Sequence, residues 1–220
     1  MNKKMETIET SYIYKKIHVI KGDKYMTPCV LKGGVWDSWL IPYLSMASKL
    51  GGSFVDVGAN IGLDTVLFSC FTKTWAFEPV LADILEKNTK DPLYPVVVAN
   101  CALSNFDGES EIYLYPGSNQ GAHSMEHPEF GNVQKIHARR LDSFAEDIGQ
   151  VSFLKIDVED HEYKVLEGAK EVIQKWHPVI CIETFNADRL KEYADANGYD
   201  IFNAPEHNYV LIYRKQANTE

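Results

Sequence analysis

The sequence predicts an α/β fold, in which helices cover both faces of a Rossmann-like, seven-stranded, mostly parallel sheet. From residue 53 onward, short apolar runs alternate with segments of helical periodicity, which is typical of parallel strands joined by helices. The run at 54–57 is followed by a glycine turn and a helical pattern. The last two apolar runs are separated only by the short segment 204–208, so the sheet should end in an antiparallel C-terminal strand.

Length, composition and charge limit the classes of protein. A chain of 220 residues with 45% hydrophobic and 24% charged residues suits one main domain. We assign 1–50 to a small β/α extension, a hairpin plus helix packed on the core, and 51–220 to the main domain. No apolar run approaches the roughly 20 residues that span a bilayer, and the N-terminus lacks a signal-peptide layout, so we expect a cytoplasmic protein without membrane contact. The net charge of −9 weighs against nucleic-acid binding.

In the N-terminal half, turn residues separate the predicted elements. The first ten residues are polar and are expected to be frayed. A hairpin should pair 12–19 with 26–31 through a turn at Lys21-Gly22-Asp23, and a helix over 36–50 should end at Gly51-Gly52. Strands and helices then alternate at 54–57, 63–70, 74–77, 81–87 and 95–99.

In the C-terminal half, the predicted alternation is interrupted by an irregular stretch. Short strands at 111–115 and 133–138 flank a polar loop, 116–131, which is long for a compact domain, and we expect it to fold over a substrate. The remaining elements are a strand at 153–156, a helix at 163–174, a strand at 179–182, a helix at 189–196 and strands at 199–203 and 209–213.

The turn at 58–62 predicts a ligand that lies against the backbone. Gly58 permits a turn conformation that a Cβ would oppose, and Gly62 lets the following helix pack close to the strand. Asp56 ends the strand, where it would repel the pyrophosphate of a dinucleotide and attract the sulfonium and ammonium groups of S-adenosylmethionine. The turn also lacks the third glycine of the dinucleotide fingerprint, so S-adenosylmethionine is favoured over a nicotinamide cofactor.

Other residues at the same sheet edge complete the expected cofactor site. Glu78 follows the second strand, at the position where an acid accepts hydrogen bonds from a ribose diol. Asn60 belongs to the turn itself. Asn100 and Ala102 follow the third strand, where an adenine ring would lie, although an ordinary turn explains them nearly as well.

These segments resemble the FkbM family of class I S-adenosylmethionine-dependent methyltransferases. Its pattern matches Phe54-Val55-Asp56-Val57-Gly58-Ala59-Asn60-Ile61-Gly62, Ala76-Phe77-Glu78-Pro79, Ala102-Leu103-Ser104 with Gly108, and the two stretches 154–162 and 165–169. The agreement extends from about residue 34 to 186. The resemblance implies a seven-stranded sheet and methyl transfer to an oxygen, often a hydroxyl of a sugar or natural product. Asp160 departs from the pattern, where the family usually has glycine.

An acidic cluster follows the predicted strand 153–156, at the same edge as Asp56. We assign catalysis to Asp157, to His161 as the general base by intrinsic pKa, and to Glu183 at the end of the next strand. Glu159 and Asn186 are assigned to binding of the methyl acceptor. The acids have a competing interpretation, because carboxylates at a helix start also stabilise the helix.

The acceptor pocket should also include Trp36, which offers an apolar face for a sugar ring, and His123 and Ser124 from the long loop. Asp157, Glu183 and Asn186 together present oxygen ligands, so a divalent cation is an alternative. We expect no metal.

The sequence therefore predicts an S-adenosylmethionine-dependent O-methyltransferase acting on a hydroxyl of a carbohydrate or small natural product. An RNA cap-type methyltransferase is the first alternative, which the net charge and the placing of Lys155 and Asp157 oppose. A non-catalytic S-adenosylmethionine-binding module is the second alternative. The sequence leaves open whether the chain forms a homo-oligomer.

Overall fold

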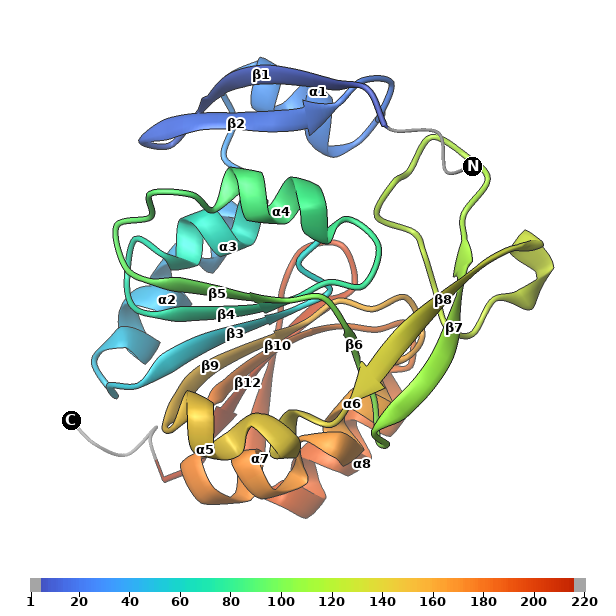
Figure 1. Ribbon diagram of the computed structural model, residues 1–220. Coiled ribbons are helices and arrows are strands. Elements are labelled where there is room, and N and C mark those ends of the chain that lie inside the picture. The colour runs from blue at the N-terminus through green and yellow to red at the C-terminus, as the bar shows by residue number, and fades with distance from the viewer. Residues whose placement is uncertain (1–4, 216–220) are drawn as a thin grey trace.

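A computed structural model describes residues 5–215. Its core is a seven-stranded sheet of order β11-β12-β10-β9-β3-β4-β5, in which only β12 runs antiparallel to its neighbours (Figure 1). The strands are β3 (Ser53–Val57), β4 (Thr74–Phe77), β5 (Val96–Ala99), β9 (Val151–Ile156), β10 (Val179–Glu183), β11 (Tyr199–Asn203) and β12 (Asn208–Tyr213). The predicted fold class is confirmed.

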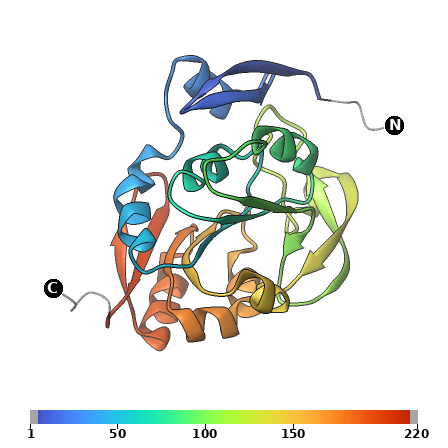
Figure 2. The same cartoon turned by 60° about the vertical axis from the view of Figure 1, so that its left-hand side comes forward.

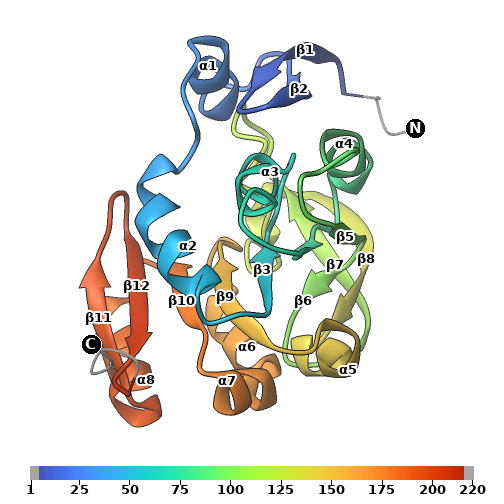
Figure 3. The same ribbon diagram turned by 90° about the vertical axis from the view of Figure 1, so that its left-hand side faces the viewer.

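Helices cover both faces of the sheet (Figure 3). Along β3, Phe54 packs with Leu44 and Phe68 on one face, whereas Val55 packs with Val172 on the other, as the period of a strand requires. The first face carries α2 (Ile41–Ser48), α3 (Leu63–Phe68) and α4 (Ala82–Asn88), and the second carries α5 (Ala145–Ile148), α6 (Glu162–Gly168), α7 (Lys170–Trp176) and α8 (Ala187–Asn197). Among the described residues, no helix has the length and apolar character needed to cross a membrane.

The N-terminal hairpin differs from the prediction. It pairs β1 (Thr7–Tyr12) with β2 (Lys15–Ile20), and the segment predicted as its second strand is helix α1 (Met26–Leu31). The turn lies at Ile13-Tyr14, where Ile13 has a φ of 53°. Asp23, assigned to the turn, instead accepts the N–H groups of Tyr25 and Thr27 and so supports the start of α1. The expected fraying of the first ten residues is wrong for residues 7–10, while residues 1–4 lie outside the described range.

The hairpin and α1 lie on the side of the molecule that carries α3 and α4 (Figure 2), and their buried side chains share a cluster with those helices. Ile17 and Val19 of β2 share a buried cluster with Ile61, Leu63 and Ile84. The helix predicted over 36–50 begins with a 3-10 turn (Ser38–Leu40) before α2, because Asp37 has a left-handed backbone with a φ of 43°. The extension therefore contributes side chains to the same sheet edge as the turn.

A second, three-stranded sheet of order β6-β8-β7 stands beside that edge. It contains β6 (Ala102–Leu103), β7 (Gly108–Leu114) and β8 (Asn132–Arg139), of which β6 was not predicted. A 3-10 turn (Leu141–Phe144) leading into α5 was also missed. The single helix predicted over 163–174 is two helices, α6 and α7, which meet at Ala169.

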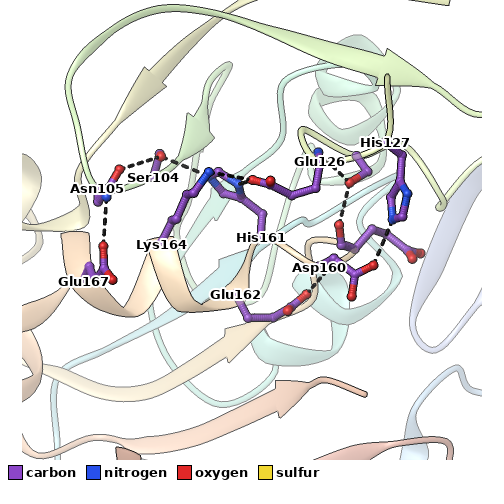
Figure 4. A network of polar contacts seen from close by, with 11 residues as sticks. Ser104, Asn105, Glu126, His127, Asp160, His161, Glu162, Lys164 and Glu167 are labelled. Carbon is purple, nitrogen blue, oxygen red and sulfur yellow. Dashed lines mark hydrogen bonds and ion pairs between the residues drawn. The ribbon is translucent and has the colours of Figure 1, made fainter. Parts of the chain in front are cut away.

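The loop between β7 and β8 is fastened to the start of α6 by polar contacts (Figure 4). His161 bridges two elements, with Nδ1 2.6 Å from Glu126 of the loop and Nε2 3.0 Å from Ser104 after β6. Nε2 of His127 lies 2.8 Å from Asp160, whose backbone is left-handed with a φ of 72°. These contacts hold the loop over the carboxyl ends of β3 and β4.

The buried hydroxyl of Ser124 is a central part of this attachment. Its Oγ donates to the carbonyl oxygen of Glu159 at 2.5 Å and accepts the N–H of Glu126 at 3.0 Å. The φ of Glu159 is 52°, so this residue also adopts the left-handed conformation. One side chain therefore joins the loop to a backbone segment of unusual shape.

We predict that Ser124→Ala loosens the loop without unfolding the sheet. The substitution leaves two part-buried backbone groups, the carbonyl of Glu159 and the N–H of Glu126, without their partner, which costs about 1 kcal/mol. Hydrogen exchange measured by mass spectrometry should become several-fold faster across 116–131, and stay unchanged in β3 and β10. Ser118→Ala, in the same loop and without such contacts, is the control. Unchanged exchange in the loop would contradict the attachment.

Candidate functional site

Two neighbouring hollows open where the carboxyl ends of the parallel strands meet. The first, named here the β4 hollow, lies between the ends of β3 and β4, the second sheet and the long loop; it is lined by Val57, Gly58, Asn60, Phe77, Glu78, Pro79, Leu81, Ala102, Leu103, Ile112, Gln120, Gly121, His123, Met125, Asp157, Val158 and His161. The second, the β10 hollow, lies toward β10 and the N-terminal extension; it is lined by Tyr25, Met26, Trp36, Gly58, Ala59, Asn60, Leu63, Asp64, Asn119, Gly121, Lys155, Asp157, Glu159, Glu183 and Glu206.

The glycine turn forms the floor that the two hollows share. Gly58 has a φ of +81°, and a Cβ there would lie 1.8 Å from the carbonyl oxygen of Asp157. Gly62 has a φ of +88°, and its Cβ would lie 2.6 Å from Leu85 Cδ1 of α4. Both positions therefore need glycine, for the conformational and packing reasons that the sequence suggested.

Glu78 ties the glycine turn to the start of α4. Its buried carboxylate accepts the N–H groups of Asn60 at 2.9 Å, Val80 at 2.7 Å and Leu81 at 3.0 Å. Burial raises the pKa of Glu78, while these hydrogen bonds oppose the rise. The side chain also lines the β4 hollow, and a carboxylate has lone pairs beyond the three that these N–H groups use.

The walls of the β4 hollow suit a flat ring. Ala102, Leu103 and Ile112 supply apolar surface from the second sheet, and His123 approaches from the loop. His123 Nδ1 accepts the N–H of Tyr115 at 3.0 Å, and burial lowers the pKa of the ring to about 4. The neutral ring therefore carries its proton on Nε2, which is buried and has no partner among the described residues.

Asn100, predicted as a cofactor residue, lies apart from both hollows. It is exposed and borders a different depression, with Cys101, Asp107 and Arg139. The chain turns at this point into β6, which brings Ala102 into the β4 hollow and leaves Asn100 outside it.

Asp56 faces neither hollow, contrary to the expected direct contact with a cofactor. It is fully buried beneath α3, where it accepts the hydroxyl of Thr65 at 2.5 Å. The nearby acid that does line the β10 hollow is Asp64, in the first turn of α3, which the sequence analysis missed. Its position two residues after Gly62, at the start of a helix next to the ligand edge, was the available signal.

Lys155 is the buried cation among these acids. It stands opposite Asp56 in the pairing of β9 with β3, and its Nζ lies 2.9 Å from Asp157 and 3.3 Å from Asp64. Burial acts to lower the pKa of Lys155, but the charges of Asp157 and Asp64 outweigh it and hold the pKa above its usual value. The ammonium therefore stays charged and fixes Asp157, which borders both hollows.

The structure brings Asp157, Glu159, Glu183 and Trp36 together around the β10 hollow, as the sequence analysis expected. Burial raises the pKa of Glu183 to about 8, and the charge of Asp157 adds to the rise. Burial also raises the pKa of Glu159 to about 7, again with a contribution from Asp157. Glu206, from the loop between β11 and β12, was not anticipated.

Three other predicted residues have structural contacts. Both ring nitrogens of His161 are hydrogen-bonded, to Glu126 and Ser104, although the residue also borders the β4 hollow. The hydroxyl of Ser124 forms the two hydrogen bonds that hold the loop. Asn186 is exposed and caps α8 by accepting the N–H of Arg189 at 3.0 Å.

The trio considered for a divalent cation is not assembled, because Asn186 caps α8 and does not line the β10 hollow. Within residues 5–215, no group of three or more His, Cys, Asp or Glu side chains has the arrangement of a metal site.

Comparison with known proteins finds methyltransferases. The chain is 28% identical over 127 residues to the hexuronic acid methyltransferase AglP of Haloferax volcanii, a match that covers 57% of this chain and 53% of that protein. The chain thus spans about half the length of this curated relative.

Two solved structures are also similar. The methyltransferase FkbM from Methylobacillus flagellatus KT has 20% identity and a TM-score of 0.48, over 74% of this chain and 44% of that one. A TehB-like SAM-dependent methyltransferase from Corynebacterium glutamicum has 10% identity and a TM-score of 0.39, over 84% and 90% of the two chains.

A protein-family model described as the methyltransferase FkbM domain matches residues 56–210, from the end of β3 to β12. This range includes the glycine turn, Glu78, the acids that follow β9 and Glu183 at the end of β10. Because the match covers well over half of the sequence, the chain belongs to the FkbM methyltransferase family.

Proposed function

We propose that the protein is an S-adenosylmethionine-dependent O-methyltransferase acting on a hydroxyl of a carbohydrate or small natural product. The observation that carries this proposal is that the two hollows share four lining residues, Gly58, Asn60, Gly121 and Asp157. A slot for a flat ring, with Glu78 at its edge, therefore lies next to a chamber lined by carboxylates. Such a pair of chambers suits a nucleoside cofactor and a hydroxylated acceptor that meet at the shared floor.

The residues of the β4 hollow fit the adenosine part of S-adenosylmethionine. Glu78 would accept hydrogen bonds from the ribose hydroxyls, and Ala102 and Leu103 would flank the adenine ring. The unpartnered Nε2–H of His123 is a donor for a ring nitrogen or hydroxyl. When bound, the cofactor supplies a methyl group on a good leaving group, so the protein must mainly align the acceptor.

Glu183 is the residue best placed to accept the proton of the acceptor hydroxyl. As the new O–CH3 bond forms and the S–CH3 bond breaks, the hydroxyl proton must leave, and a carboxylate with a pKa of about 8 is a suitable base near neutral pH. Asp157 is held by Lys155 at the floor shared by the hollows, where it would orient the acceptor.

Two further observations support a small hydroxylated acceptor. The curated relative AglP is named for a hexuronic acid, a carbohydrate. The acidic lining of the β10 hollow and the net charge of −9 oppose an RNA acceptor, whose phosphates would be repelled.

We predict that S-adenosylmethionine stabilises the protein against heat. At a concentration about 100 times its Kd, binding adds about 2.7 kcal/mol, which corresponds to a rise in Tm of roughly 5–10 °C. Glu78→Gln should weaken binding about tenfold or more, because an amide N–H would face the ribose hydroxyls in place of an oxygen. Differential scanning fluorimetry measures each variant's shift relative to its own cofactor-free Tm. Glu86→Gln, exposed on α4, is the control, and absence of any shift for the wild type at millimolar cofactor would refute the proposal.

We predict that Glu183→Gln raises stability at high pH and lowers activity. The folded pKa of about 8 lies above the unfolded value of 4.5, so ionised Glu183 opposes folding increasingly as the pH rises from 4.5 through 8. Urea unfolding should show equal stability near pH 4 and a variant more stable by roughly 1 kcal/mol at pH 8.5, after allowance for solvent exposure.

In the same variant, S-adenosylhomocysteine release should fall about 100-fold or more and lose the rise with pH that the wild type shows up to about pH 8. Glu192→Gln, on the exposed side of α8, should change neither property. A variant that keeps the wild-type pH profile would show that another group accepts the proton.

A further inference from the structure

The ring of His127 lies between two carboxylates. In the loop that joins β7 to β8, its Nδ1 lies 2.7 Å from Oε1 of Glu129. Its Nε2 lies 2.8 Å from Oδ2 of Asp160, which belongs to the segment after β9 (Figure 4). An ionised carboxylate only accepts hydrogen bonds, whereas a neutral imidazole has a single N–H to donate. Both contacts can therefore be hydrogen bonds only when the ring is protonated.

Aromatic packing fixes the orientation of this ring. His127 stacks on Phe130, with ring centroids 5.1 Å apart and an interplanar angle of 18°. Phe130 in turn packs edge-on against Tyr115, with centroids 5.2 Å apart. Because an aromatic face attracts a cation, the stack also favours the protonated ring. The packing thus holds both ring nitrogens toward their carboxylates in the charged state.

The charges around His127 favour its protonated form. The hydrogen bond to Glu129 and, after it, the one to Asp160 raise the pKa of His127 above 6.5, although burial opposes the rise. Glu159, next to Asp160, adds a further carboxylate whose charge interacts with the ring. The carboxylate of Glu126 is directed elsewhere, since it lies 2.9 Å from the ammonium of a lysine on α6. Negative charge therefore faces the ring from the loop and from the segment after β9.

The other attachments of the loop do not need this proton. Ser124 donates to a backbone carbonyl, and Glu126 pairs with Lys164. His161 also contacts Glu126, but burial lowers the pKa of its ring, so it changes charge at a lower pH than His127. As the pH rises above neutrality, the contact made by His127 is therefore the attachment that weakens.

We propose that His127 is a pH-sensitive latch: its protonated ring joins the loop 116–131 to Asp160 and keeps the roof of the β4 hollow closed, and loss of the proton releases this contact. Asp160 is suited to the role by its backbone as well as its charge. Its φ of 72° is a conformation that side chains rarely adopt, and it places the carboxylate beside the loop.

The latch should hold at low pH and open at high pH. Since the folded pKa of His127 lies above the ordinary value of 6.5, its stabilising effect is complete below about pH 6.5 and is lost as the pH rises through the folded pKa. Gln120, His123 and Met125 of the loop line the β4 hollow, so opening the loop should speed release of a bound nucleoside. This consequence rests on the proposed function, whereas the latch itself does not.

Titration of the ring by NMR tests the contact directly. In the full chain without added ligand, the His127 signal, identified by its absence from His127→Gln, should titrate above the ordinary pKa of 6.5. Asp160→Asn removes one of the two charges and should lower this pKa, whereas Glu86→Gln, exposed on α4, should leave it unchanged. A pKa at or below 6.5, or one that Asp160→Asn does not alter, would overturn the latch.

Hydrogen exchange measured by mass spectrometry tests whether the ring holds the loop. After correction for intrinsic exchange rates, protection across 116–131 should fall about threefold between about pH 6 and about pH 8.5, a size typical of exposed ion pairs. Burial raises the pKa values of Glu159 and Glu162 to about 7, and both residues stay in every variant, so comparison with His127→Gln assigns the effect. That variant should have lower protection at about pH 6 and lose the threefold change. His137→Gln, which removes an exposed histidine of β8, should behave as the wild type. A wild-type profile for His127→Gln would refute the inference.

Release of S-adenosylhomocysteine tests the consequence for the hollow. Its dissociation rate, measured by stopped flow, should rise about threefold over the same pH range in the wild type and stay level in His127→Gln. A level rate in the wild type, whose loop does open, would overturn the role of the latch in ligand release. If S-adenosylhomocysteine does not bind at all, the proposed function fails, while the ring titration and the exchange of the loop still decide the latch.

Discussion

The arrangement of the site depends on the buried ammonium of Lys155. A lysine inside a protein is stable only when carboxylates surround it, and here Asp157 and Asp64 lie within 3.3 Å of Nζ. These contacts join the end of β9 to the first turn of α3, across the glycine turn that both hollows share. The alternation along β9 explains the position: Leu154 and Ile156 face α6 and α7, so Lys155 must face α3. Without this cation, the acids at the edge would repel one another.

Two carboxylates of the β10 hollow oppose folding when they are ionised. Glu159 and Glu183 are held where burial makes their ionisation unfavourable. The same carboxylates on an exposed surface would ionise without this loss of folding free energy. Proteins tolerate such local conflicts where function requires them and compensate for them elsewhere. Here the compensation comes from the apolar packing on both faces of the central sheet, which is independent of the edge.

The parts that could be predicted from the sequence are those with local causes. The strands, their order of alternation and the glycine turn follow from periodicity and backbone sterics. The N-terminal hairpin was misread because Lys21-Gly22-Asp23 has turn composition, whereas the actual turn places Ile13 at a φ of 53°, which no rule favours. The role of His161 could not be predicted either, because its partners Glu126 and Ser104 are 35 and 57 residues away in the chain. Asp56 was assigned to the wrong surface because strand position alone does not show which helix covers a side chain.

The two left-handed residues after β9 place one short segment in contact with both hollows. The side chain of Glu159 lines the β10 hollow, while its carbonyl oxygen and the neighbouring Asp160 hold the loop that roofs the β4 hollow. A ligand in the β10 hollow that moves Glu159 therefore also moves the loop over the β4 hollow, and the reverse holds for a ligand in the β4 hollow. By thermodynamic linkage, each ligand then changes the binding affinity of the other by the same factor.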